Sequence, residues 1–396
     1  MRKYDFDKKV SRLNTNSIKW DFRTNCSPKA QEDGLPLWIA DMDFECADPI
    51  IDSLHKLVDH KIFGYSSNKT DEYYDAVCGW YKRRFNWDIN REDIVFTPGV
   101  VPAVSLLIKI LTEEGDGIIV QKPVYHPFEA KIKINKRRVV NNPLIYKNGE
   151  YTIDFEDLEE KAKSVENKLL ILCSPHNPVG RVWKEEELKK IIEICKKHNL
   201  WVISDEIHSD LLREGVKHTP MHFICGDYKD RVVVCTAPSK TFNLAGMQLS
   251  NIIISNKELR DKYKNEMMFT GVSMSPNPFA IVATIAAYNE SEDWVDELNE
   301  YLDGNMEFID TYLKENLPKV KLVKSQGTYL AWLDFTAYGL NEVELEDIMF
   351  KKANVLLDEG YIFGKEGVGF ERVNAACPKS TLKDFLDRVK DAFKDM

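Results

Sequence analysis

The stretch that decides the fold is "RVVVCTAPSKTFNLAG" at residues 231–246, a short β-branched run followed by a turn. Five further apolar runs have the same form: "DIVF" (93–96), "GIIV" (117–120), "KLLILC" (168–173), "LWVIS" (200–204) and "NIIIS" (251–255). Short runs that are apolar on both faces are typical of parallel strands covered by helices on each side. Helical patterns lie between them, so the sequence predicts an α/β fold with a mostly parallel sheet.

A second domain is expected because a chain of 396 residues exceeds the size at which one hydrophobic core stops growing. The pattern changes near residue 290, where a long amphipathic helix (292–317) is followed by strands at 320–323 and 328–335, another helix and a terminal helix. We therefore expect a large domain over 47–288. A smaller α+β domain should combine 1–46 with 289–396.

The charge pattern excludes several partners. The net charge is −10, and there are only short basic clusters such as "KRR" at 136–138, which argues against nucleic acid and gives no basic face for a membrane. No apolar run reaches membrane-spanning length, and the first residues lack the apolar core of a secretory signal. The cysteines are scattered without a C-x-x-C pair, as expected for reduced thiols of a cytoplasmic protein: 26, 46, 78, 173, 195, 225, 235 and 377.

Polar and aromatic groups follow five of the predicted strands, at the edge where open parallel sheets bind ligands. The segments are "TPGVVPA" (97–103), "KPVYHPF" (122–128), "SPHNPVG" (174–180), "DEIH" (205–208) and "TAPSK" (236–240). Together they supply an amine, a carboxylate, an amide, aromatic faces, hydroxyls and a helix N-terminus. That set matches pyridoxal 5'-phosphate (PLP), which needs an amine for its aldehyde, a carboxylate for its ring nitrogen and donors for its phosphate.

Eight motifs in order give the chain a resemblance to a known family: "ADMDF" (40–44), "FGY" (63–65), "FTPGVVPA" (96–103), "PVYHPF" (123–128), "SPHNPVGRVW" (174–183), "SDEIHSDL" (204–211), "APSKTFNLAG" (237–246) and "FERVN" (370–374). The chain resembles the fold-type I PLP enzymes of the class I/II aminotransferase superfamily. More narrowly, it resembles the MalY/PatB-type cystathionine β-lyases. This likeness implies the PLP-dependent transferase fold and PLP as cofactor.

The resemblance implies roles around the cofactor ring. Lys240 matches the lysine that forms the Schiff base and then acts as general base. Asp205 matches the carboxylate at the ring nitrogen, Asn177 the amide at the ring oxygen, and Tyr125 the stacking aromatic. Taken singly, these residues are also consistent with a surface lysine, a helix N-cap, an Asn-Pro turn and a packed tyrosine. His208 is expected either to orient Asp205 or to fill space.

The phosphate is expected at the start of the helix that "PGVV" opens. Val100 and Val101 would contribute main-chain N–H groups, and Thr236 and Ser239 hydroxyls. Tyr65 resembles the tyrosine that reaches the phosphate from a neighbouring subunit, which implies a homodimer with shared active sites. One position departs from many aminotransferases, because residue 248, eight after the lysine, is glutamine where they carry arginine.

The substrate is expected to be a small molecule of the amino-acid class. Arg372 matches the arginine that binds the α-carboxylate through two parallel hydrogen bonds, and the backbone near Ala40 and the Asn177 amide are expected to support it. A metal site is not expected, because "DEIH" and His176 lack a defined ligand spacing.

The resemblance favours a carbon–sulfur β-lyase that cleaves cystathionine, cysteine or cysteine S-conjugates by α,β-elimination to pyruvate, ammonia and a thiol. The alternative is an aminotransferase, because both reactions begin with loss of the Cα proton. A third hypothesis is a transcription factor with an aminotransferase-like domain. Such a protein needs a DNA-binding extension, whereas the enzyme-like pattern of this sequence already begins near residue 20. A secondary protein-binding role stays open, and the sequence does not distinguish among the sulfur substrates.

Overall fold

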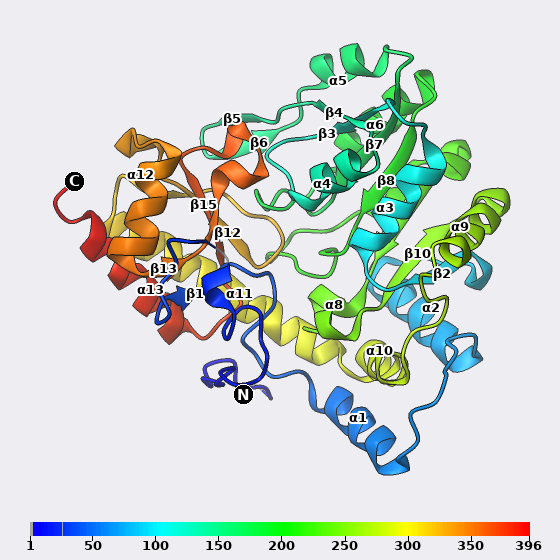
Figure 1. Ribbon diagram of the computed structural model, residues 1–396, viewed down its shortest axis with the longest axis horizontal. Coiled ribbons are helices and arrows are strands. Elements are labelled where there is room, and N and C mark those ends of the chain that lie inside the picture. The colour runs from blue at the N-terminus through cyan, green and yellow to red at the C-terminus, as the bar shows by residue number, and fades with distance from the viewer. Residues whose placement is uncertain (1–2, 26) are drawn as a thin grey trace.

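The computed structural model describes residues 3–25 and 27–396, and its largest sheet has seven strands in the order β2-β10-β9-β8-β7-β3-β4 (Figure 1). Their bounds are β2 Ile94–Thr97, β3 Gly117–Val120, β4 Arg138–Asn141, β7 Asn167–Cys173, β8 Trp201–Asp205, β9 Val232–Thr236 and β10 Ser250–Ile254. Strand β10 is antiparallel to both of its neighbours, whereas the pairs among β9, β8, β7, β3 and β4 are all parallel. The prediction of a mostly parallel sheet is confirmed.

The sheet is buried on both faces because successive side chains of a strand point to opposite sides. In β7, Leu169, Ile171 and Cys173 pack in one hydrophobic cluster, which they share with α3 (Val100–Leu111), α4 (Pro127–Ile134) and α9 (Lys257–Phe269). Leu170 and Leu172 pack in another cluster on the opposite face. Helices of that second face are α2 (Asp71–Phe85), α5 (Phe155–Ala162), α6 (Glu185–Lys197) and α10 (Pro278–Glu290). The strands of the large sheet are apolar on both faces because each face packs against its own layer of helices.

The helices begin and end where the local sequence dictates. Helix α6 has three glutamates in its first turn and two lysines in its last, which complements the helix dipole, and Glu187 accepts a hydrogen bond from the Lys184 N–H at 2.8 Å. Helix α10 is capped by Asn277, whose side chain accepts from the Ala280 N–H. The remaining helices are α1 Asp48–His60, α7 Met221–Ile224, α8 Pro238–Thr241, α11 Glu292–Asn316, α12 Glu342–Asp347 and α13 Lys379–Phe393.

A second sheet stands beside the first, with four antiparallel strands in the order β11-β12-β15-β14 (Figure 1). Its strands are β11 Lys321–Leu322, β12 Leu330–Asp334, β14 Asp358–Glu359 and β15 Phe370–Asn374. One face of this sheet packs with α11 and α13 in a second hydrophobic cluster, whereas Leu330, Trp332 and Phe370 of the other face join a cluster of the large sheet. The N-terminal segment joins this part of the molecule, because β1 (Leu35–Pro36) pairs in parallel with β13 (Val355–Leu356). A two-stranded hairpin is formed by β5 (Ile145–Lys147) and β6 (Glu150–Thr152).

The smaller sheet has a core of its own on one face only, and the division into domains at residues 47 and 289 stays a prediction. Among the residues that the structure describes, no helix combines the length and apolarity needed to cross a membrane. Seven of the predicted thiols are free cysteines, and Cys26 lies outside the described residues.

Candidate active site

A cavity of about 170 Å³ lies beyond the carboxyl ends of the large sheet, where the parallel arrangement brings the strand ends together. Segments that follow five strands line it, together with Ala40 from the N-terminal segment. The lining residues are Ala40, Gly99, Val100, Val101, Pro102, Tyr125, Cys173, Asn177, Asp205, Ile207, His208 and Lys240.

Lys240 reaches this cavity from α8, which begins directly after β9 with Pro238 in its first turn. Its Nζ donates a hydrogen bond to the Ala40 carbonyl at 2.6 Å. Burial lowers the pKa of Lys240 to about 8, and the nearby Arg372 cation contributes, while Asp41 and Asp205 oppose the shift. An amine with this pKa is partly neutral at pH 7 and is therefore a competent nucleophile and base. Lys240 therefore does not extend its ammonium to bulk solvent, because its Nζ lies in the cavity against the Ala40 carbonyl.

Asp205 is the last residue of β8, and its carboxylate is buried in the cavity wall. Its Oδ1 accepts a hydrogen bond from the Ile207 N–H at 3.2 Å, within a turn rather than at the start of a helix. Burial raises the pKa of Asp205 to about 7, and no cation of the described chain forms an ion pair with it. A carboxylate in this setting favours a partner that brings a proton or a positive charge.

His208 lines the same cavity and is buried. Burial lowers its pKa to about 3, with Lys240 and Arg372 contributing, so its ring is neutral. Its Nδ1 has no hydrogen-bond partner within residues 3–25 and 27–396, and its ring lies edge-on to Tyr329 with 5.9 Å between centroids. The ring packs against Tyr329, and both predicted roles of His208 stay predictions.

Arg372 lies in β15 with 3% of the residue exposed; it does not itself line the cavity, but its guanidinium contacts Asn177, which does. One Nη donates to Asn177 Oδ1 at 3.0 Å, and the other donates to the Trp38 carbonyl at 3.0 Å and to the Asp358 carboxylate. Its Nε is buried without a partner in the described chain. An arginine that is fixed on three sides and keeps a free donor is suited to a carboxylate ligand.

The start of α3 forms another wall of the cavity. Gly99 precedes this helix with a φ of 105°, a conformation that favours glycine, and it turns the chain directly into Val100. The N–H groups of Val100 and Val101 belong to the first turn and so have no partner within the helix. Free N–H groups and the positive end of a 12-residue helix dipole favour an anion at this position.

Three predicted cofactor residues do not line the cavity of this single chain. The Thr236 hydroxyl donates to the Asn251 carbonyl at 2.9 Å, within the sheet. Ser239 is half-buried in α8 beside Lys240. Tyr65 is fully exposed and borders a separate surface hollow of about 380 Å³ together with Gln248. The phosphate roles of these residues stay predictions.

The structure adds functional candidates that the sequence did not indicate. The Tyr329 hydroxyl donates to the Ala40 carbonyl at 2.7 Å, so this carbonyl is shared with Lys240. Asp358 pairs with Arg372 across the β14–β15 ladder. Asn243 contacts the loop that carries Ala40. The two residues of each hydrogen-bonded pair lie 14 to 289 residues apart along the chain, so local sequence does not indicate the contacts. Of the three added residues, Asn243 alone lies inside a quoted motif, "APSKTFNLAG".

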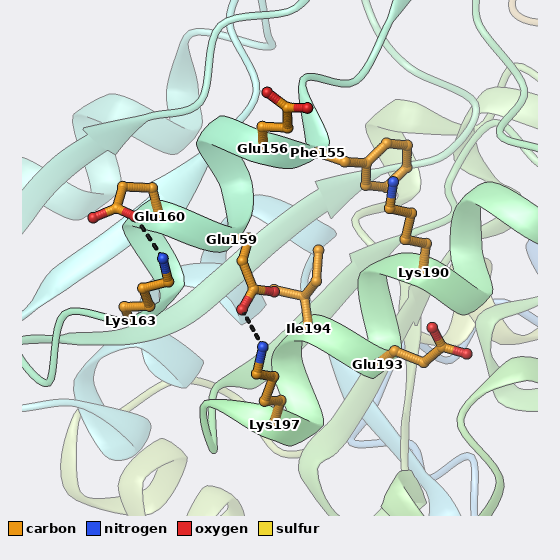
Figure 2. A pocket seen from close by; sticks show the side chains of 9 residues that line it. All are labelled: Phe155, Glu156, Glu159, Glu160, Lys163, Lys190, Glu193, Ile194 and Lys197. Atoms are coloured by element: carbon orange, nitrogen blue, oxygen red, sulfur yellow. Dashed lines mark hydrogen bonds and ion pairs between the residues drawn. The ribbon is translucent and has the colours of Figure 1, made fainter.

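A wider hollow of about 620 Å³ lies between α5 and α6 and differs in character (Figure 2). Lys190 lies over the Phe155 ring at 4.3 Å, and Glu159 pairs with Lys197 at 2.6 Å. These charged groups pair with one another on a solvated surface. Unlike the cavity at Lys240, this hollow does not gather unsatisfied polar groups around a ligand position.

The residues around Lys240 fit PLP. The neutral fraction of the lysine supplies the amine, the unpaired Asp205 carboxylate is suited to a protonated ring nitrogen, and the free N–H groups of α3 are suited to the phosphate. Tyr125 offers an aromatic wall, and burial raises the pKa of its hydroxyl to about 12, so it stays protonated. The fit therefore rests on groups that are incompletely satisfied in the protein alone.

The fold and this cavity define the class of the protein. Residues 32–389 match the family model for aminotransferase class I and II, and the chain belongs to that family. It is 46% identical to cystathionine β-lyase PatB of Bacillus subtilis over 98% of this chain and 99% of the relative. It is 34% identical to protein MalY of Escherichia coli over 96% of each chain.

Solved structures agree with this grouping. The crystal structure of cystalysin from Treponema denticola, which contains PLP, superimposes with a TM-score of 0.95 at 41% identity over 99% of both chains. An aspartate aminotransferase of Pyrococcus horikoshii is more distant, with 25% identity over 99% of this chain and 98% of the relative. The family, the PLP-dependent transferase fold and the nearer likeness to β-lyases are thus established as predicted from the motifs.

Proposed function

We propose that this protein is a PLP-dependent carbon–sulfur β-lyase that converts cystathionine or a related cysteine S-conjugate to pyruvate, ammonia and a thiol. The observation that carries the proposal is the 46% identity over nearly the whole chain to a cystathionine β-lyase, against 25% to an aspartate aminotransferase. The cavity around Lys240 supplies the groups that this chemistry needs.

PLP, when bound, supplies an aldehyde for amine condensation and a ring that accepts electrons released at the substrate Cα. Lys240 would hold the aldehyde, Asp205 the ring nitrogen, Asn177 the ring oxygen, and the N–H groups of Val100 and Val101 the phosphate. Asp205, which is buried, would be ionised beside the positive charge of that nitrogen and would favour its protonated form. Tyr125 would offer its aromatic face to the ring and exclude water from it.

Lys240 performs the proton transfers of the reaction. Its Nζ takes the proton from the substrate Cα, which a pKa near 8 permits at neutral pH. The protonated Nζ then donates to the sulfur that departs from Cβ. A thiolate is a competent leaving group, so elimination proceeds without a second substrate. The Ala40 carbonyl, 2.6 Å from Nζ, steadies the amine between these steps.

Arg372 binds and orients the substrate through its α-carboxylate. Asn177 and the Trp38 carbonyl hold the guanidinium by hydrogen bonds of 3.0 Å, and Asp358 holds it from the adjacent strand. A fixed guanidinium loses little conformational entropy when it binds a carboxylate. The substrate Cα is thereby held within reach of Lys240.

The active enzyme is proposed to be a homodimer. Apolar side chains are exposed close to Tyr65 on the loop after α1, with Ile62 at 66% and Phe63 at 55%. Phe269 at the end of α9 is also exposed, at 82%. An apolar surface of this kind is typical of a protein interface. A second copy of the chain would cover it and bring the partner's Tyr65 to the phosphate.

A cytoplasmic location is also part of the proposal. The seven described cysteines are free, and five of them are buried. Thiols that remain reduced are typical of a compartment that does not form disulfides.

Pyruvate release from cystathionine in the absence of any 2-oxo acid tests the proposed function. The purified protein with PLP should form pyruvate and a free thiol in equal amounts, and alanine, which lacks a leaving group at Cβ, should give no pyruvate by elimination. Turnover that strictly requires a 2-oxo acid and releases no thiol would show that the protein is an aminotransferase instead.

A further inference from the structure

The loop 39–44 is held by side chains from distant parts of the sequence. Each of its carbonyls at residues 39, 40, 41, 42 and 44 accepts a hydrogen bond from a side chain elsewhere. The donors are Asn374 for Ile39 (2.7 Å) and Asp41 (2.5 Å), Lys240 and Tyr329 for Ala40 (2.6 and 2.7 Å), and Asn243 for Met42 and Phe44 (3.1 Å each). A loop satisfied to this extent has a fixed position relative to Lys240.

Asn243 makes the most complete set of these contacts. Its Nδ2 donates to both Met42 and Phe44, and its Oδ1 accepts from the Met42 N–H at 3.0 Å. It stands three residues after Lys240 and has a φ of 58°, a left-handed conformation that asparagine tolerates better than most residues. The segment that carries the lysine is thereby bound directly to the loop that carries the lysine's acceptor.

We propose that Asn243 is a positioning residue, which fixes the Ala40 carbonyl as the hydrogen-bond acceptor of the free Lys240 amine. A neutral amine has one lone pair, and its direction depends on where the N–H groups point. A fixed acceptor for one N–H holds the amine in a single orientation and leaves the lone pair available for the substrate Cα proton. The kinetic consequence rests on the proposed function, whereas the effect on Lys240 itself does not.

The loop has independent support, so loss of Asn243 should not unfold it. On its outer side, the fully buried Lys19 pairs with Asp43 at 2.7 Å, and Arg12 pairs with Asp41 at 2.7 Å. Breaking the Asn243 contacts should therefore loosen the Ala40 carbonyl without releasing the loop. Asn243→Leu is suited to this purpose because it keeps a similar volume and changes no charge.

The test measures the pH dependence of Lys240 modification in the full-length chain without cofactor. An amine-directed reagent is applied at a series of pH values, and mass spectrometry quantifies the modified Lys240 peptide. Modification of the unsubstituted protein should rise through a midpoint near the pKa of about 8. The charged groups that face Nζ, namely Arg372, Asp41 and Asp205, are the same in every variant.

Two substitutions should shift the midpoint in opposite directions. Asn243→Leu should lower it by about one unit, because the ammonium loses a fixed acceptor. Tyr329→Phe removes the competing donor to the Ala40 carbonyl and should raise it. With PLP and cystathionine, Asn243→Leu should lower kcat about tenfold while KM changes less than about twofold, because Arg372 is untouched.

The matched control is Asn142→Leu. Asn142 is fully buried, its Nδ2 donates to the Asp154 carbonyl and the Asp157 carboxylate, and it does not line the cavity. This control should lower the melting temperature and leave the Lys240 midpoint unchanged. An unchanged midpoint in Asn243→Leu, or in Tyr329→Phe if the first variant does not fold, would overturn the proposal. Shifted midpoints without cystathionine turnover would instead reject the proposed function and retain the positioning role.

Discussion

Replacement of Arg372 by lysine is the sharpest test of the substrate site. Substitution by alanine would leave the half-buried Asp358 carboxylate without its cation and so mix a stability defect with a binding defect. Lysine keeps the positive charge but offers a single ammonium in place of a planar pair of donors. The substitution therefore removes the two-point geometry and leaves the local charge balance unchanged.

The expected magnitude follows from the contacts of the guanidinium. Its Nη groups are committed to Asn177, Trp38 and Asp358, and its Nε is unpartnered, so a bound carboxylate gains hydrogen bonds that a lysine cannot reproduce. Loss of one charge-assisted hydrogen bond costs about 1.5–3 kcal/mol. At about 1.4 kcal/mol for each tenfold change, kcat/KM should fall roughly ten- to hundredfold.

The assay is the initial rate of pyruvate formation against cystathionine concentration. Most of the loss should appear in KM, and the visible absorbance of the bound cofactor should stay unchanged because Arg372 faces the substrate. Arg260→Lys is the control, since Arg260 is equally buried and donates to Asp93 at 2.7 Å far from the cavity. Equal kinetic effects of the two substitutions, or an unchanged kcat/KM in Arg372→Lys, would refute the assigned role.

Three further predictions concern the cofactor and the subunit interface. Lys240→Ala should abolish the visible absorbance of the PLP-loaded protein and its turnover, and loss of the absorbance on changing a different lysine would contradict the assignment. Mixing a Tyr65→Phe variant with a Lys240→Ala variant should restore activity through hybrid sites, whereas a monomer in sedimentation would exclude this. Asp205→Asn should raise the melting temperature of the cofactor-free protein at pH 8 and weaken PLP binding. The pKa of Asp205 is raised to about 7, so the destabilisation by its buried charge is fully present above pH 7 and declines as pH falls toward the ordinary pKa near 4. The gain in melting temperature from Asp205→Asn should therefore be smaller at pH 5 than at pH 8. An equal gain at both pH values would show that burial of this charge is not the cause.

The large sheet was predictable because its central strands are apolar on both faces. Strand β4 escaped prediction, since it lies at the edge of the sheet and its residues are exposed or half-buried. The reversed direction of β10 was also beyond reach, because "NIIIS" reads the same whether its neighbours run parallel or antiparallel. Hydrophobic pattern reports burial, and strand direction depends on the connections.

The site was predictable where residues follow strands of one sheet. Asp205, Asn177, Tyr125 and Lys240 meet because parallel strands end at the same edge. Thr236 shows the limit of this reasoning, since the last residue of β9 turns its hydroxyl toward Asn251. Contacts such as Tyr329 with Ala40 depend on how the smaller sheet docks, and no local pattern encodes that arrangement.

The hydrogen bonds from Asn374 to the loop 39–44 have a consequence for biosynthesis. Asn374 and Arg372 lie in β15, near the end of the chain, yet they complete the surroundings of a site whose first wall is residue 40. During translation, the nascent chain carries the lysine, the aspartate and helix α3 before the strand that completes their surroundings has been synthesised. Cofactor capture in its final geometry must therefore wait until β15 has been synthesised and has paired with β12.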